Sequence, residues 1–220
     1  MPQPTVEAPS RAPLTREQVL RTALAYIDEF GLDALSMHKL GARLGVKAMS
    51  LYNHIDGKNG LLDGIVELLW SDMRPAPPPS GDWRQWLRAA AIAIRETLRR
   101  HPAAAPLVMS RPVMPLSALR VTKAQLDALQ EAGFSRARAV EVIRAVLSYA
   151  FGYALSELCW SCAAPGAESE LGRLRRVSQL LPHDVPDDLL AVAMDVCGNC
   201  DLDAPFRLGL DLMLEGLRPA

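Results

Sequence analysis

A short turn at Leu44-Gly45-Val46 most strongly limits how this chain can fold, because it separates two short helical segments. Ser36 is placed to cap the first segment, whose apolar side chains repeat at helical spacing up to the turn. The second segment is predicted over residues 48–54. Gly45 permits the left-handed backbone that a tight turn between helices needs. The pattern predicts a helix-turn-helix.

Helical periodicity continues through the rest of the chain. Thr15-Arg16-Glu17-Gln18 fits a capping box, and the helix behind it is expected to end at Gly31. Ser117 and Ser135 are expected to cap later helices. Helices are also predicted over residues 58–73, 83–100, 117–132, 136–162, 171–181, 187–196 and 205–217, while residues 103–110 form a short segment between prolines. No stretch shows the β-branched and aromatic alternation of strands, so the predicted fold class is all-α.

A proline-rich stretch over residues 74–81 divides the chain, because its prolines cannot continue a helix. We therefore expect a domain boundary there. Residues 1–14 hold four prolines without apolar periodicity and are expected to form a flexible N-terminal arm. The predicted organisation is a helix-turn-helix domain over residues 15–73 and a second helical domain over residues 82–220.

The charge of the chain is concentrated locally. The net charge is −1, so the protein as a whole is not a general binder of polyanions. Residues 36–58 nevertheless carry four basic side chains against the single acidic Asp56. A local basic surface on a nearly neutral protein is typical of a chain in which one face meets phosphate.

The residues after the turn resemble a known family. Ser50-Leu51-Tyr52-Asn53-His54-Ile55, followed by Lys58 and Leu61-Leu62-Asp63, closely resembles the DNA-binding region of TetR-family regulators. Phe206-Arg207-Leu208-Gly209-Leu210-Asp211 similarly resembles the end of a tetracycline-repressor-like ligand domain. The resemblance is strong over residues 15–73 and weaker in the C-terminal half.

The resemblance implies a ligand-responsive transcriptional regulator, a repressor, with an N-terminal three-helix DNA-binding domain and a helical ligand-binding and dimerisation domain. It would bind a palindromic, double-stranded DNA operator as a homodimer and be released by a small molecule. The implied DNA-contacting residues are Ser36, Lys39, Lys47, Ala48, Met49, Ser50, Tyr52, Asn53, His54 and Lys58. Ala48 and Met49 cannot form bidentate hydrogen bonds with bases, although they could contact a thymine methyl group.

The resemblance also implies how the second domain works. Residues 136–162 and 205–217 would pair with a second copy as a four-helix bundle, with packing inside one chain as the alternative. A helical pocket would hold an unknown small-molecule ligand. Its candidate lining residues, of a kind that is more often ordinary core than ligand contact, are Trp86, His101, Met109, Met114, Leu126, Phe151 and Leu155. No cofactor and no metal are expected.

Two CxxC pairs leave one alternative open. Cys159, Cys162, Cys197 and Cys200 have a spacing that resembles a four-thiolate zinc site, so a metal- or redox-sensing regulator is possible. An enzyme is a weaker alternative, since the chain shows no Gly-rich phosphate loop, nucleophile elbow or HExxH motif. A scaffold protein would leave the basic segment without a purpose.

Localisation is predicted to be cytoplasmic. The N-terminus lacks the apolar run of a secretion signal. The longest apolar stretch, residues 145–158, is interrupted by polar residues and is too short to span a bilayer, so no membrane association is expected.

Overall fold

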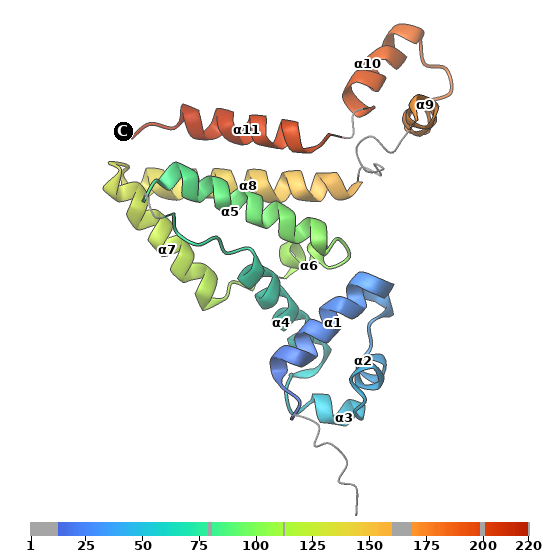
Figure 1. The fold of residues 1–220 in the computed structure, drawn as a ribbon, viewed down its shortest axis with the longest axis vertical. Coiled ribbons are helices and arrows are strands. Elements are labelled where there is room, and N and C mark those ends of the chain that lie inside the picture. Colours follow the sequence, from blue (N-terminus) through green and yellow to red (C-terminus); the bar gives the residue numbers. More distant parts are fainter. Residues whose placement is uncertain (1–12, 79–80, 112, 160–168, 199–200, 220) are drawn as a thin grey trace, which may run out of the picture. The chain divides into compact units, whose positions relative to one another are not determined.

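The computed structural model describes residues 13–78, 81–111, 113–159, 169–198 and 201–219. These residues form helices and turns without any strand, which confirms the predicted all-α class (Figure 1). The chain divides into two units. The first combines residues 1–72 with residues 101–115, and the second combines residues 73–100 with residues 116–220.

The first unit holds α1 (Arg16–Phe30), α2 (Met37–Leu44), α3 (Ala48–Leu51), α4 (Gly57–Asp72) and α6 (Ala105–Ser110). The predicted capping box opens α1, because Thr15 accepts from the Gln18 N–H and the Gln18 side chain accepts from the Thr15 N–H. Gly31 ends α1 with a φ of 84°, a conformation that favours glycine. The core of this unit lies mainly between α1 and α4, where Leu20, Ile27, Leu61, Ile65 and Leu69 are buried.

The predicted helix over residues 48–54 is wrong in length. α3 ends at Leu51, and residues 52–54 form turns instead. The Ile55 N–H donates to the Leu51 carbonyl, and both side chains are buried. Anchoring Ile55 in the core turns the chain into α4, which starts at Gly57 with a φ of 65°.

The second unit holds α5 (Trp83–Arg100), α7 (Leu116–Glu131), α8 (Arg136–Cys159), α9 (Glu170–Ser178), α10 (Asp187–Cys197) and α11 (Asp203–Gly216). α8 packs mainly on α5, with α7 and α11 beside it. The Ser135 hydroxyl accepts from the Arg138 N–H, so the predicted cap of α8 is confirmed. The predicted cap at Ser117 is wrong, because α7 already begins at Leu116.

Arginines on α5 hold α11 along its length. Arg84 donates to the carbonyls of Leu214 and Leu217 at 3.2 and 2.9 Å, and so satisfies carbonyls at the end of α11. Arg88 pairs with Asp211 in the middle of the helix, and Arg99 pairs with Asp203 in its first turn. α11 is therefore fixed to its own chain by polar contacts as well as by the buried Phe206, Leu210 and Leu214.

Only part of the surface of α8 is buried in the single chain. Ala145, Ser148 and Gly152 are exposed, whereas Val142, Val146 and Ala150 are buried. From the sequence, the apolar stretch over residues 145–158 is too short to span a bilayer. The helix around it is longer, and residues 136–158 are long and apolar enough to cross a bilayer by length and composition alone. Core helices pass the same test, and α8 packs on α5, α7 and α11.

Candidate nucleic-acid interface and ligand domain

Two glycines, Gly41 and Gly45, allow α2 and α3 to pack closely in the helix-turn-helix. The Ser36 hydroxyl accepts from the Lys39 N–H, which confirms the predicted cap of α2. Gly45 ends α2 in the left-handed region with φ 68° and ψ 32°, as predicted. Gly41 lies where α2 meets α3, and a Cβ built on it would come within 2.9 Å of the Val46 carbonyl oxygen. Only glycine at position 41 permits this close approach of the two helices.

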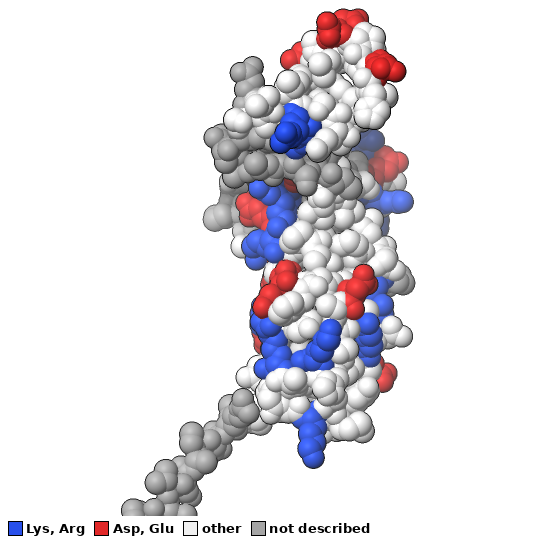
Figure 2. All heavy atoms as spheres, turned by 90° about the vertical axis from the view of Figure 1, so that its right-hand side faces the viewer, with Lys and Arg blue, Asp and Glu red and all other residues white. Residues whose placement is uncertain are grey.

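The side chains of α3 are exposed or half-buried, except for Leu51, which lies in the core. Leu51 is fully buried, while Met49 is 74% exposed and Tyr52 is 50% exposed. The ten residues predicted to contact DNA all lie between the cap of α2 and the first turn of α4. Lys39, Lys47, Met49, Tyr52, Asn53 and Lys58 are exposed, whereas Ser36, Ala48, Ser50 and His54 are half-buried. Figure 2 shows Lys and Arg side chains gathered on this unit, in the lower part of the view.

The last turn of α1 supports α2. Arg43 of α2 forms a salt bridge with Glu29 at 2.5 Å. The same guanidinium lies over the rings of Tyr26 and Phe30, at 5.7 Å from each centroid. A cation shared between a carboxylate and two aromatic faces fixes the angle between α1 and α2.

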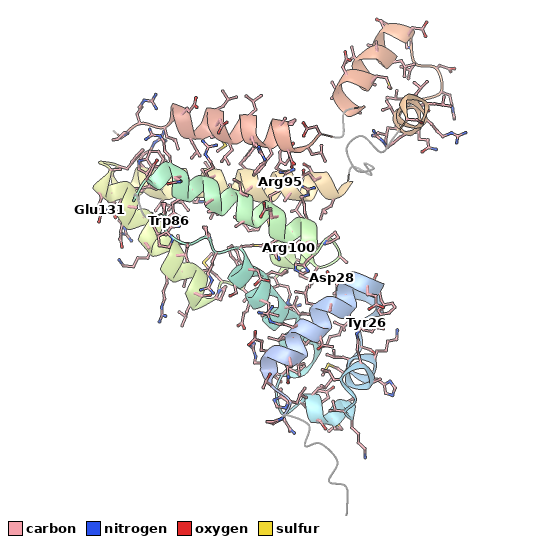
Figure 3. The ribbon with its side chains drawn as sticks, viewed as in Figure 1. Tyr26, Asp28, Trp86, Arg95, Arg100 and Glu131 are labelled. Atoms are coloured by element: carbon pink, nitrogen blue, oxygen red, sulfur yellow. The ribbon has the colours of Figure 1, made fainter. Side chains whose placement is uncertain are left out.

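Residues 101–115 are also attached to this unit by polar contacts. His101 Nδ1 lies 2.8 Å from Asp28 Oδ2 on α1, and Asp28 is labelled in Figure 3. Arg111 donates to Asp63 of α4 at 2.6 Å and to the Asn59 carbonyl at 3.3 Å. The segment that contains α6 is thus held to both α1 and α4.

The second unit contains a buried ion pair between α5 and α8 that sequence reasoning missed. Arg95 and Glu157 are 6% and 8% exposed, and Asp203 at the start of α11 lies 2.6 Å from the same guanidinium. Burial alone lowers the pKa of Arg95, but the hydrogen bonds and charges of both carboxylates outweigh it and raise that pKa above its usual range. One feature of the sequence could have indicated this pair: Arg95 is a charged residue on the apolar face of the helix predicted over residues 83–100.

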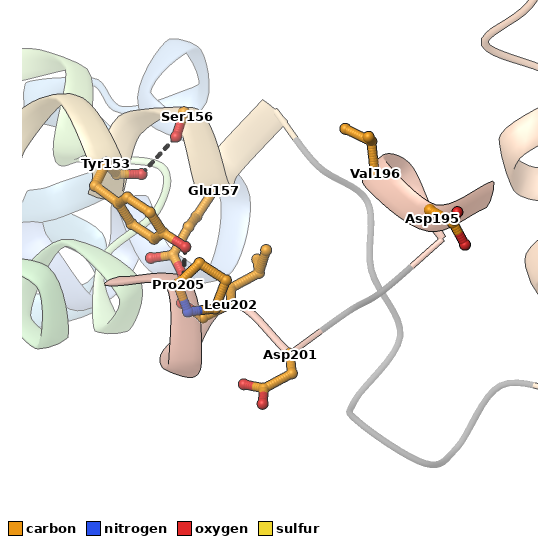
Figure 4. A pocket seen from close by; sticks show the side chains of 8 residues that line it. All are labelled: Tyr153, Ser156, Glu157, Asp195, Val196, Asp201, Leu202 and Pro205. Atoms are coloured by element: carbon orange, nitrogen blue, oxygen red, sulfur yellow. Dashed lines mark hydrogen bonds between the residues drawn. The ribbon is translucent and has the colours of Figure 1, made fainter. Parts of the chain in front are cut away.

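A cavity of about 330 Å³ lies beside this pair (Figure 4). It is lined by Tyr153, Ser156, Glu157, Asp195, Val196, Asp201, Leu202 and Pro205. The Tyr153 hydroxyl donates to the Leu202 carbonyl at 2.9 Å, and the Ser156 hydroxyl donates to the Tyr153 carbonyl at 2.8 Å. Several of its polar groups are therefore already engaged within the protein.

The seven predicted ligand residues are divided between the two units. His101, Met109 and Met114 belong to the first unit, and the two methionines are 61% and 56% exposed. In the second unit Trp86 and Phe151 are buried, and Leu126 and Leu155 are half-buried. None of the seven lines the cavity beside Glu157. Their role in binding a ligand stays a prediction.

Trp86 has one further property. Its indole N–H is buried and has no hydrogen-bond partner among the described residues. A buried donor of this kind normally has a partner, so Trp86 is the predicted ligand residue with the clearest unused polar group.

The cysteine alternative receives no support. Cys162 and Cys200 lie outside the described residues, and the side chain of Cys159 is not described either. Within the part of the chain that is described, no group of three or more His, Cys, Asp or Glu side chains could hold a metal. Cys197 carries a free thiol.

Comparisons with known proteins agree with this architecture. Residues 19–65 match the family of bacterial regulatory proteins, tetR family, and residues 74–220 match the tetracyclin repressor-like, C-terminal domain. The chain is 32% identical to the tetracycline repressor protein class A from transposon 1721 of Escherichia coli, over 90% of this chain and 88% of that protein. It is 35% identical to the HTH-type transcriptional repressor DrrR1 of Streptomyces coeruleorubidus, over 97% of this chain and 82% of that protein.

A solved structure shares the fold as well. A variant of TetR from Acinetobacter baumannii AYE in complex with minocycline is 27% identical, with a TM-score of 0.71 and coverage of 93% of both chains. A helix-turn-helix unit joined to a second helical unit is the architecture of a DNA-binding transcriptional regulator. The chain belongs to the TetR family, whose members are DNA-binding, ligand-responsive regulators.

Proposed function

We propose that this protein is a cytoplasmic repressor that binds a palindromic operator as a homodimer and is released from it by a small molecule. Residues 15–73 are the DNA-binding domain and residues 82–220 the ligand-binding and dimerisation domain. The observation that carries the proposal is the exposed surface of α3, anchored by the buried Leu51 and flanked by exposed lysines.

The α3 surface suits the major groove. Lys47 precedes α3, and Lys58 lies in the first turn of α4, so both ends of this segment carry a positive charge for phosphates. Met49 is 74% exposed and apolar. It would contact a thymine methyl group rather than hydrogen-bond to a base. The operator is therefore expected to contain a thymine at the position facing Met49.

Apolar residues exposed on α8 and α11 support a homodimer. Leu208 and Leu212 lie one turn apart on α11 and are 61% and 66% exposed, and Val140 of α8 is 37% exposed. Ala145, Ser148 and Gly152 are small and exposed in the middle of α8, which permits close packing of a second helix there. A second copy that covers these faces would form the four-helix bundle. Dimerisation would also place two α3 helices on successive major grooves.

A small-molecule inducer is supported by the relative that was solved with minocycline. Within the second unit, the candidate lining residues Leu126, Phe151 and Leu155 are apolar, and Trp86 supplies a buried indole N–H. An inducer with an apolar body and a hydrogen-bond acceptor would suit them. It relieves repression only if it binds the conformer that releases DNA better than the conformer that holds it.

A direct test measures binding to the duplex DNA that flanks the gene of this protein, by fluorescence anisotropy over a range of salt concentrations. We expect saturable, salt-sensitive binding with two chains per duplex. Lys47→Ala should weaken binding and reduce the salt slope by about 1 per chain. Lys123→Ala removes the same charge from α7, where Lys123 pairs with Asp127, and serves as the matched control. Equal loss in both variants would show that α3 is not the contact surface.

A further inference from the structure

The last turn of α1 is a junction between the operator-reading helices and residues 101–115. One of its carboxylates, Glu29, holds Arg43 of α2. The neighbouring carboxylate, Asp28, holds His101. The two contacts start from consecutive residues of one helix, so a change at His101 has a short route to α2 that does not pass through α4.

The His101 contact is placed to sense protonation. The two side chains are only 17% and 28% exposed, and the imidazole nitrogen lies 2.8 Å from the carboxylate oxygen. A protonated imidazole adds charge attraction to this hydrogen bond, whereas a neutral imidazole does not. Histidine is the side chain whose charge most readily changes within the pH range that cells experience.

We propose that the His101–Asp28 contact is a proton-sensitive clasp that tightens operator binding as the pH falls. This inference rests on the proposed function. The clasp holds the last turn of α1 and, through Glu29 and Arg43, the position of α2. A better-fixed helix-turn-helix loses less conformational freedom when it binds DNA, so closing the clasp increases affinity. With a neutral His101 the clasp is weaker and affinity is lower.

The other charged groups near the clasp are engaged by partners of their own, so Asp28 is the carboxylate that pairs with His101. On α1, Glu29 is engaged by Arg43. On α4, Asp63 is engaged by Arg111 and Glu67 by Arg16. In the sequence before His101, Arg100 donates to Thr97, and Arg99 pairs with Asp203. Protonation of His101 therefore meets one carboxylate at hydrogen-bond distance among the described residues.

The test compares operator affinity at about pH 6 and about pH 8, at fixed ionic strength, on the duplex that flanks the gene. His38 and His54 also belong to the helix-turn-helix unit, and they are the same in all variants, so the comparison between variants isolates His101. We divide the dissociation constant at about pH 8 by that at about pH 6. This ratio should be about two- to fivefold larger in the wild type than in His101→Gln or Asp28→Asn, which is the range expected of a partly exposed ion pair. The double variant should match either single variant, because both remove the same contact.

His183→Gln is the matched control, since His183 is exposed in the second unit and should leave the wild-type ratio unchanged. The melting temperature gives a second readout. It should fall more between pH 6 and pH 8 in the wild type than in Asp28→Asn, which keeps the size of the side chain. Equal ratios in the wild type and both single variants would overturn the clasp while leaving the proposed function intact. A wild type that shows no specific DNA binding would overturn the proposed function itself, and the clasp with it.

Discussion

Arg95 and Glu157 lie 62 residues apart in the sequence and form a two-point hydrogen-bonded pair, with distances of 2.8 and 2.5 Å, inside the second unit. The Arg95 guanidinium also lies 4.7 Å from the centroid of the Phe206 ring on α11. One side chain of α5 thus contacts both helices that we assign to the dimer bundle. Arg95 is labelled on α5 in Figure 3.

Removing one charge of this pair should destabilise the protein. Glu157→Gln leaves a buried guanidinium with Asp203 alone, and we expect a loss of about 3 kcal/mol in the free energy of unfolding. Urea denaturation followed by circular dichroism measures it. The double variant Arg95→Met/Glu157→Leu should recover most of the loss, because it leaves no uncompensated buried charge. A double variant less stable than the single one would contradict this account.

Asp203 should make the protein sensitive to acid. Its pKa is lowered, first by the hydrogen bond from Arg95 and further by the charges of Arg95 and Arg99, although burial opposes the shift. A carboxylate with a lowered folded pKa contributes stability that is complete above the ordinary Asp value and is lost as the pH falls through the lowered value. Between about pH 4 and pH 2, the melting temperature of the wild type should therefore fall faster than that of Asp203→Asn. Parallel curves would rule out this role of Asp203.

Gly41→Ala should damage the helix-turn-helix. Its Cβ would lie 2.9 Å from the Val46 carbonyl and 3.1 Å from the Ala48 nitrogen, so α3 must shift away from α2. We expect a loss of about 1–3 kcal/mol in stability together with weaker operator binding. Gly216→Ala is the control, because a Cβ added at this position of α11 would meet nothing within 4 Å. Wild-type DNA affinity in Gly41→Ala would show that the α2–α3 contact does not position the reading surface.

Several features of the fold follow from local sequence. The caps at Thr15, Ser36 and Ser135 and the left-handed Gly45 were predictable, because each depends on residues within a few positions of one another. The end of α3 was not, since it depends on Ile55 packing in the core. Leu51 and Ile55 lie four residues apart, which also fits a continuous helix, so this spacing could not reveal the turn between them.

Contacts between distant residues could not be predicted. The partner of His101 is 73 residues away on α1, and no periodicity links the two positions. The ligand role of His101 stays a prediction, and its contact with Asp28 in the first unit is an additional feature that the structure shows. The attachment of residues 101–115 to the helix-turn-helix unit was likewise hidden, because it depends on Arg111 reaching Asp63 and Asn59.

A charge on the exposed face of α11 should separate the proposed dimer. Leu212→Glu places a carboxylate where a second copy would pack, and Leu212 is not part of the buried core of its own chain. We expect a monomer in light scattering at concentrations where the wild type is a dimer, with a similar circular dichroism spectrum. Glu215→Gln, on an exposed position of the same helix, should keep the wild-type mass. A dimeric Leu212→Glu would place the interface elsewhere.

Hydroxyl-radical footprinting of the wild type on the duplex flanking its gene tests the central claim most directly. Two α3 helices on successive major grooves predict two protected half-sites related by a twofold axis, with centres about 10 base pairs apart. Lys47→Ala should lose this protection at protein concentrations that saturate the wild type. Uniform protection along the duplex, or a pattern unchanged by Lys47→Ala, would contradict a paired helix-turn-helix reader.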